Sequence, residues 1–142
     1  MSKHTLQKAK EYCEEHKLRY TGPREDVLKA LLASKKPLGA YDILECLTTG
    51  DHTPKPPTIY RAIDFWTEHG FIHKIESLNV FAACHAGHNH KSSQFIVCND
   101  CGKVEEFHLC QMPQDLQNTI TTNGFKMAHW SAEIHGTCSQ CQ

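Results

Sequence analysis

The sequence predicts a protein of the α+β class, with a mainly helical unit first and a smaller unit of strands and one helix after it. Apolar residues recur at helical spacing in the first half of the chain and then change to a period of two, which indicates strands. Six of the 8 Cys and six of the 11 His fall within residues 81–142. The second unit is too short to bury much core, so it needs a metal, a partner subunit or both.

Four helices are expected in the first unit. The first covers about residues 3–17, and the second begins at Thr21, a residue type that caps helix N-termini. The third lies at residues 40–47. The fourth opens at Pro57 and ends at Gly70, because proline is tolerated in a first turn and glycine favours a helix end.

A β-hairpin is expected after the fourth helix, because residues 71–76 alternate in polarity and residues 80–83 form an extended run. Helices followed by a hairpin are the layout of a winged helix-turn-helix, which we assign to residues 1–84. Its fourth helix would enter the DNA major groove and its hairpin would be the wing. The same layout also describes a small helical bundle that carries a hairpin.

The rest of the chain divides into a loop and a second unit. Residues 85–93 are polar and rich in His and Gly, which predicts a hinge and ligand loop. The second unit, residues 94–142, is expected to hold strands at 94–97 and 103–107, a helix from Pro113 to about Asn123, and a mostly extended segment at 125–134.

Composition narrows the class of protein. The net charge of −1 argues against a strongly basic, non-specific nucleic-acid binder, although it leaves room for a local DNA-reading helix. No stretch approaches the roughly 18 apolar residues of a membrane span, and the polar N-terminus resembles no secretory signal. These features predict a cytoplasmic protein, in which clustered cysteines more often bind metal than form disulfides.

Two C-x-x-C pairs are the sharpest motif in the chain: Cys98 with Cys101, and Cys138 with Cys141. Four thiolates in two such pairs wrap a tetrahedral zinc ion. A site with four protein ligands has no open position, so its role is structural, and it supplies on the order of 10 kcal/mol of folding free energy. The alternatives are a pair of disulfides or a redox C-x-x-C.

A looser group of potential metal ligands lies around the first cysteine pair. It comprises His73, Cys84, His85, His88, His90, Glu105, Glu106, His108 and Cys110. One hairpin imidazole, the thiolate, one loop imidazole and one carboxylate would make a tetrahedral site that couples the two units, as a sensor requires. A thiolate ligand favours zinc over Mn²⁺ or Fe²⁺. The alternative is a set of surface histidines in a polar loop.

The fourth helix carries residue types that read DNA. Thr58, Tyr60, Arg61 and Asp64 fall on its polar faces, and Lys55 lies just ahead of it. Arginine pairs with guanine, tyrosine contacts thymine methyl groups or phosphates, and lysine binds phosphate. An ordinary solvated helix face has a similar composition.

Several motifs, in order along nearly the whole chain, resemble the ferric uptake regulator (Fur) family, most closely the branch that regulates zinc uptake. They are residues 21–24 (TGPR), 40–44 (AYDIL), 55–65 (KPPTIYRAIDF), 70–77 (GFIHKIES), 98–106 (CNDCGKVEE) and 133–141 (EIHGTCSQC). The resemblance implies a cytoplasmic homodimer whose C-terminal α/β domain, residues 94–142, mediates dimerisation. It implies a repressor that binds double-stranded DNA at palindromic operators of zinc-uptake genes when zinc is plentiful.

The resemblance also assigns residues. It implies at least two zinc ions per subunit, no membrane partner and no small-molecule substrate. The matching structural-zinc positions are Cys98, Cys101, Cys138 and Cys141. The matching regulatory positions are His73, Cys84, one loop histidine and Glu106. The matching DNA contacts are Tyr41, Tyr60 and Arg61, with Arg24 near a phosphate; Lys55 and Thr58 complete the predicted DNA-binding set.

The chain departs from the family pattern before the first cysteine pair. A dense His-rich run is replaced there by residues 88–93 (HNHKSS). The loop ligand is therefore open between His90 and His88, of which we favour His90. A further family metal site that uses His129 or His135 is not expected here.

Three rival functions stay open at this point. The chain could be a family member that senses iron, manganese or peroxide, although Cys84 argues against those metals. It could instead be a zinc enzyme of the hydrolase type, with Glu106 as general base, but no nucleophile motif supports this reading and we expect no enzyme. The third is a zinc-storage or purely structural dimer.

Overall fold

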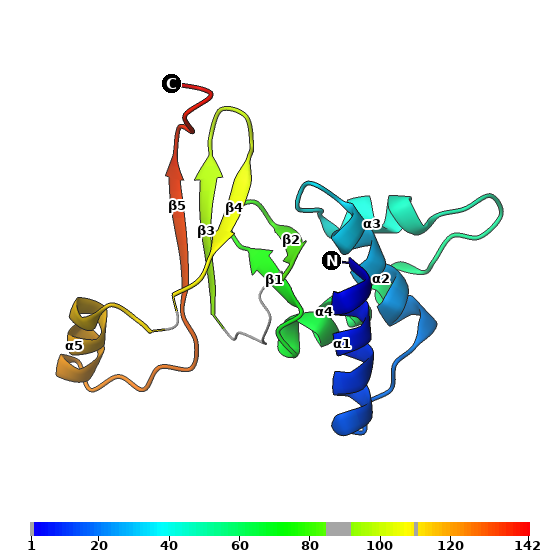
Figure 1. Ribbon diagram of the computed structural model, residues 1–142, viewed down its shortest axis with the longest axis horizontal. Coiled ribbons are helices and arrows are strands. Elements are labelled where there is room, and N and C mark those ends of the chain that lie inside the picture. The colour runs from blue at the N-terminus through cyan, green and yellow to red at the C-terminus, as the bar shows by residue number, and fades with distance from the viewer. Residues whose placement is uncertain (1, 85–91, 110) are drawn as a thin grey trace. The chain divides into compact units, whose positions relative to one another are not determined.

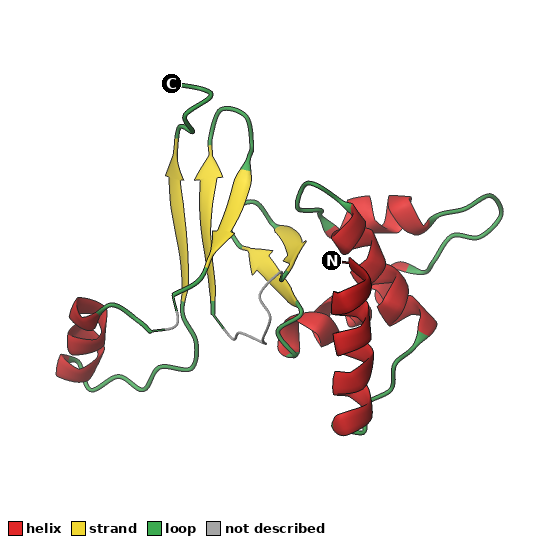
Figure 2. Cartoon of the chain, in the orientation of Figure 1, coloured by secondary structure: helices red, strands yellow, loops and turns green. Residues whose placement is uncertain are grey.

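The computed structural model describes residues 2–84, 92–109 and 111–142. The chain separates into two compact units, Met1–His90 and Lys91–Gln142, and each is described here by itself. Helices dominate the first unit and strands the second (Figures 1 and 2). Residues 85–91 of the predicted hinge lie outside the described residues.

The first unit contains the four expected helices: α1 (Ser2–Glu15), α2 (Gly22–Ala33), α3 (Ala40–Leu47) and α4 (Pro56–Glu68). Thr21 caps α2 as expected, because its hydroxyl accepts a hydrogen bond from the Arg24 backbone N–H at 3.5 Å. Gly70 follows α4 with φ +79°, in the left-handed region that favours glycine. The local signals in the sequence therefore place these helices correctly.

The hairpin after α4 consists of β1 (Ile72–Ile75) and β2 (Val80–Ala83), which pair antiparallel. Leu38, in the loop between α2 and α3, exchanges two backbone hydrogen bonds with Phe81, at 2.9 and 2.7 Å. The loop thereby ties the hairpin to the helices. Helices with a tied hairpin confirm the predicted winged helix-turn-helix.

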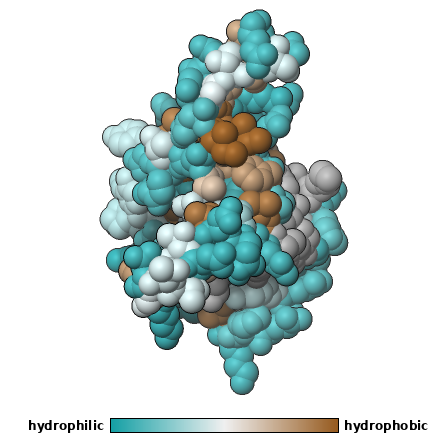
Figure 3. Space-filling view, turned by 90° about the vertical axis from the view of Figure 1, so that its left-hand side faces the viewer, coloured by the Kyte–Doolittle hydropathy of each residue, from teal (hydrophilic) through white to brown (hydrophobic). Residues whose placement is uncertain are grey.

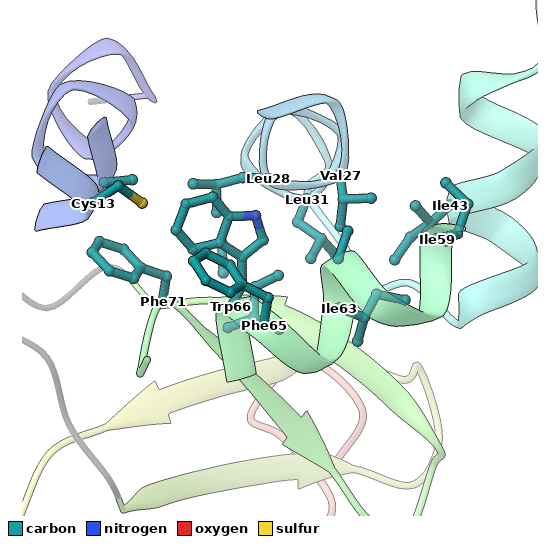
Figure 4. Close-up of a cluster of buried hydrophobic side chains, with 14 residues drawn as sticks. Cys13, Val27, Leu28, Leu31, Ile43, Ile59, Ile63, Phe65, Trp66 and Phe71 are labelled. Carbon is teal, nitrogen blue, oxygen red and sulfur yellow. The ribbon is translucent and has the colours of Figure 1, made fainter. Parts of the chain in front are cut away.

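A single apolar core holds α4 in place. Trp66 is fully buried at its centre, and its ring meets Phe65 and Phe71 edge to face at centroid distances of 4.9 and 5.2 Å (Figure 4). The indole N–H donates to the Arg24 carbonyl at 2.7 Å, so the one polar atom of this ring is satisfied. The buried face of α4 comprises Ile59, Ala62, Ile63, Phe65 and Trp66. Because this face is held in the core, the opposite face of α4 is exposed to solvent.

The second unit contains β3 (Ser93–Cys98), β4 (Val104–Phe107), α5 (Gln114–Thr122) and β5 (Ser131–Gly136). The strand order is β4-β3-β5, with β3 antiparallel to β4 and parallel to β5. The extended segment expected at 125–134 is a strand only from Ser131. Ser131 pairs with Ser93, where β3 begins, so among the described residues β3 offers no partner to the residues before Ser131.

Apolar side chains of the second unit remain exposed. None of the residues of α5 is buried. Figure 3 shows hydrophobic residues among hydrophilic ones on the face it presents. The most exposed large ones in this unit are Phe125, Ile134, Leu116 and Ile96. Among the described residues, no helix is long and apolar enough to cross a membrane.

Candidate metal centres and nucleic-acid interface

The two C-x-x-C pairs meet at one end of the second unit's sheet. β3 and β5 run parallel and their pairing ends at Cys98 opposite Gly136, so the turns that follow the two strands lie at the same end (Figure 1). Cys98 is the last residue of β3, and its N–H donates to the Lys103 carbonyl at 2.9 Å across the first turn. Gly102 closes this turn with φ +74° and an N–H···O bond of 3.0 Å to the Cys98 carbonyl.

The four sulfur atoms have the spacing that a tetrahedral zinc site requires. All lie within 4.8 Å of one another, and the sulfurs of Cys101 and Cys138 are 3.8 Å apart. Four sulfurs at a Zn–S distance of about 2.3 Å are separated by roughly 3.8 Å at the corners of a tetrahedron. All four cysteines are free of disulfides. The predicted Cys₄ set thus fits zinc, and the geometry disagrees with the two disulfides that were the alternative.

The protonation chemistry of this cluster also fits a metal cation. Backbone N–H groups of Cys101 and Cys138 point at the Cys98 sulfur and lower the pKa of that thiol to about 6. The N–H of Cys138 is 3.3 Å from this sulfur. Hydrogen bonds with the sulfurs of Cys138 and Cys101 raise the pKa of Cys141 to about 12. Four thiolates repel one another unless a cation lies between them, and zinc supplies that charge.

A second pair of potential ligands lies in the wing. His73 on β1 and Cys84 just after β2 are both buried, with exposed fractions of 6% and 5%. Their ligand atoms lie within 4.8 Å of each other. The Cys84 N–H donates to the Phe71 carbonyl at 2.9 Å, which continues the hairpin ladder by one bond and holds the thiol against β1. An imidazole and a thiol in a buried pair suit zinc.

Of the other predicted regulatory ligands, the structure describes Glu106 but not the loop histidines. Glu106 lies on β4, in the second unit, and is half-buried. The loop candidates His88 and His90 lie outside the described residues. Within the first unit the structure brings His73 and Cys84 together, and the parts that Glu106 and a loop histidine play stay predictions.

The predicted DNA-reading residues share the outer face of the first unit's helices. Tyr60 and Arg61 are exposed on α4, Lys55 is exposed at its N-cap, and Thr58 is half-buried in its first turn. Tyr41 on α3 is 80% exposed. Tyr41 and Tyr60 line one small pocket of ≈50 Å³, whose other residues are Ala40, Leu44, Pro56 and Ile59. Two exposed aromatic rings around an apolar recess, with cations on the same helix, suit contact with bases and phosphates.

Arg24, which is predicted to lie near a phosphate, also makes contacts within the first unit. Its guanidinium lies over the Phe65 ring, 3.7 Å from the centroid, and donates to the Arg19 carbonyl. Its carbonyl accepts the Trp66 indole N–H. Sequence reasoning missed these contacts, because Phe65 and Trp66 lie more than 40 residues further along the chain. Arg24 connects the start of α2 with the inner side of α4.

Comparison with known proteins identifies the family of the chain. The model of the ferric uptake regulator family matches residues 15–135. The zinc uptake regulation protein of Escherichia coli (strain K12) is 37% identical over 139 residues, which cover 96% of this chain and 80% of the relative. The peroxide operon regulator of Bacillus subtilis (strain 168) is 27% identical over 144 residues, with 99% and 96% covered.

Solved structures give the same result. A zinc uptake regulator complexed with zinc and DNA matches at a TM-score of 0.83 and 32% identity, with 99% of this chain and 95% of the other covered. The crystal structure of holo XcZur matches at a TM-score of 0.85 and 33% identity, with 99% and 98% covered. Because the family match spans most of the sequence and the fold agrees throughout, the chain belongs to the ferric uptake regulator family.

Proposed function

We propose that this chain is a zinc-responsive transcriptional repressor, which binds palindromic operators of zinc-uptake genes as a zinc-loaded homodimer in the cytoplasm. The buried pair of His73 and Cys84 at the wing carries the proposal. A thiolate in the sensing site selects zinc over Fe²⁺ and Mn²⁺, whose preferred ligands are nitrogen and oxygen. The similarity to the zinc uptake regulation protein of E. coli, higher than to the peroxide operon regulator of B. subtilis, supports the same metal.

The regulatory site is proposed to consist of His73, Cys84, His90 and Glu106, with His88 as the alternate loop ligand. The first two ligands belong to the winged helix and Glu106 belongs to the second unit. A bound zinc ion would supply four bonds that join these residues. Ligands drawn from both units restrict how the units move relative to each other, so conformations that fit DNA gain population. The Cys₄ set would hold a second, structural zinc ion in each subunit.

The second unit supports the homodimer. β5 is an edge strand of its sheet, and α5 buries no residue within its own chain. Exposed Phe125, Leu116 and Ile134 supply apolar surface that a second copy would cover. A two-fold dimer presents two α4 helices, so its operator should be a palindrome whose half-sites are about one helical turn, roughly 34 Å, apart. No part of this function requires catalysis.

The test of the proposal is DNA binding under buffered free metal. An A·T-rich palindrome from a zinc-transporter promoter is titrated with the protein at fixed free Zn²⁺, Fe²⁺ or Mn²⁺. We expect tighter DNA binding with zinc alone, and tighter zinc binding in the presence of the operator, because the coupling between two ligands is reciprocal. Tightening by Fe²⁺ or Mn²⁺ instead would assign the protein to another branch of the family. A DNA affinity that does not change with any of the three metals would contradict the repressor model.

Arg24 offers a sharper test within the DNA-binding unit. Its guanidinium is engaged by Phe65 and Arg19, so we expect Arg24→Gln to weaken DNA binding without changing the slope of log K against log salt. Loss of a phosphate contact would instead make this slope shallower by about 0.9. The matched control is Lys55→Gln at the exposed start of α4, for which the shallower slope is expected. A shallower slope for Arg24→Gln would establish the phosphate contact that the sequence predicts.

A further inference from the structure

A chain of polar side chains runs from β5 to the first cysteine turn. The Nε2 atom of His135 is 3.0 Å from Glu133 Oε2, and its Nδ1 atom is 3.3 Å from Asn99 Oδ1. Glu133 is the more protected end, with 18% of its side chain exposed against 34% for His135. Both ring nitrogens of His135 are therefore engaged within the protein, in the turn region of the Cys₄ cluster.

Strand geometry brings the three residues together. Glu133 and His135 are two apart on β5, so their side chains lie on the same face of the sheet. The parallel register sets His135 opposite Val97, one residue before the end of β3. The Asn99 N–H then donates to the Gly136 carbonyl at 2.8 Å. Asn99 is thus fastened to β5 twice, once through its backbone and once through its side chain.

The chemistry of the groups sets the direction of these bonds. A carboxylate only accepts hydrogen bonds, so His135 Nε2 carries hydrogen and donates to Glu133. Nδ1 of the neutral imidazole is then an acceptor, so the Asn99 side chain donates to it through its amide NH2, which a half-turn of the amide group places at the position of Oδ1. In this arrangement both ring nitrogens of His135 face protein groups, Glu133 on one side and Asn99 on the other. Glu133 fixes the orientation of the His135 ring, and the ring in turn fixes the position of the Asn99 side chain.

We propose that His135 and Asn99 are positioning residues for the structural metal centre, with Glu133 orienting the imidazole. Asn99 lies between Cys98 and Cys101, so fastening it sets the conformation of the turn and the direction of both sulfurs. The inference rests on the proposed binding of zinc by the four cysteines. Groups that orient metal ligands from outside the coordination shell typically change metal affinity by about 10–100-fold when they are replaced.

The experiment follows the transfer of zinc from the full-length, zinc-loaded protein to an excess of the chromogenic chelator 4-(2-pyridylazo)resorcinol. We expect His135→Ala and Asn99→Ala each to speed the slow phase of zinc release on the order of 10-fold. The double variant should be no faster than either single one, because both replacements remove the same contact. Parent rates in both single variants would overturn the proposal.

Conservative variants separate positioning from a general loss of structure. Nδ1 of histidine is two bonds from Cβ, as are the side-chain oxygen and nitrogen of asparagine, whereas Nε2 corresponds to the end of glutamine. His135→Asn should therefore restore most of the parent rate, while His135→Gln should stay fast. Equal rates for these two variants would overturn the proposed contact with Asn99. Ser139→Ala, an exposed neutral change in the second cysteine turn, is the matched control and should release zinc at the parent rate.

Cobalt substitution distinguishes a positioning residue from a ligand. The visible spectrum of the Co²⁺-loaded Cys₄ site should be the same in His135→Ala as in the parent, because the four sulfurs still bind. A changed spectrum would make the imidazole a ligand and overturn the proposal. The zinc content of Cys98→Ser is measured first. If it equals that of the parent, the four cysteines do not bind zinc and the proposed zinc centre is wrong. The release kinetics of the other variants test only the positioning role.

Discussion

Replacing Cys98 by serine should remove one zinc ion per chain and unfold the second unit. A serine hydroxyl cannot replace the thiolate that accepts the backbone N–H groups of Cys101 and Cys138. Structural zinc sites supply on the order of 10 kcal/mol of folding free energy, which is comparable to the whole stability of a typical domain. This unit has little else to hold it, since α5 buries no residue and β5 is an edge strand.

Three measurements test this prediction: the zinc content per chain by mass spectrometry, the thermal unfolding curve, and the mass of the protein in solution. We expect loss of the second unit's unfolding transition and dissociation to monomers. Cys46→Ser is the matched control, because Cys46 is an exposed single cysteine on α3 and lies in neither cluster. A Cys98→Ser protein that keeps its zinc and its melting temperature would show that the four sulfurs do not form a metal centre.

Replacing Cys84 by serine should abolish the response to zinc while the second unit stays folded. Cys84 is buried beside His73 at the end of the wing, so the change removes the one soft ligand of the proposed regulatory site. DNA affinity at saturating zinc should fall by about 5–150-fold, the usual range of coupling between two ligands. The residual affinity should no longer depend on free zinc.

Operator binding at several buffered zinc concentrations, together with zinc per chain, measures the second effect. Cys84→Ser should lose one ion per chain, like Cys98→Ser, but keep the second unit's unfolding transition. Cys46→Ser again serves as control and should respond to zinc like the parent. An unchanged zinc response in Cys84→Ser would remove the reason for preferring zinc over iron or manganese as the sensed metal.

Helices and their ends were predictable because their signals are local. Thr21 as a cap and Gly70 as a terminator act within one turn of the backbone, and both act as expected. The Cys₄ cluster was predictable too, because two C-x-x-C turns carry their ligand geometry within four residues. The start of the fourth helix was predicted at Pro57, one residue after its observed start at Pro56, from proline and the spacing of the apolar face.

What could not be predicted depends on contacts between distant strands. The start of β5 at Ser131 is set by where β3 begins, and no residue near Ser131 signals it. The contact of His135 with Asn99 depends on the same parallel register, across 36 residues. Arg24 stacks on Phe65 only because α2 packs against α4, and no local signal in the sequence predicts that packing. Each of these required the tertiary structure.

The parallel pairing of β3 with β5 also orders events during synthesis. Cys138, whose backbone N–H donates a hydrogen bond to the Cys98 sulfur, is 40 residues further along the chain. Ribosomes add about 5–20 residues per second, so β3 waits about 2–8 s for its parallel neighbour and the second half of its metal centre. The winged helix, complete before β3, has time to fold first. During that interval the backbone N–H and C=O groups on one edge of β3 have no strand to pair with. Chaperones, or fast synthesis of β5, must then keep this edge from pairing with other chains.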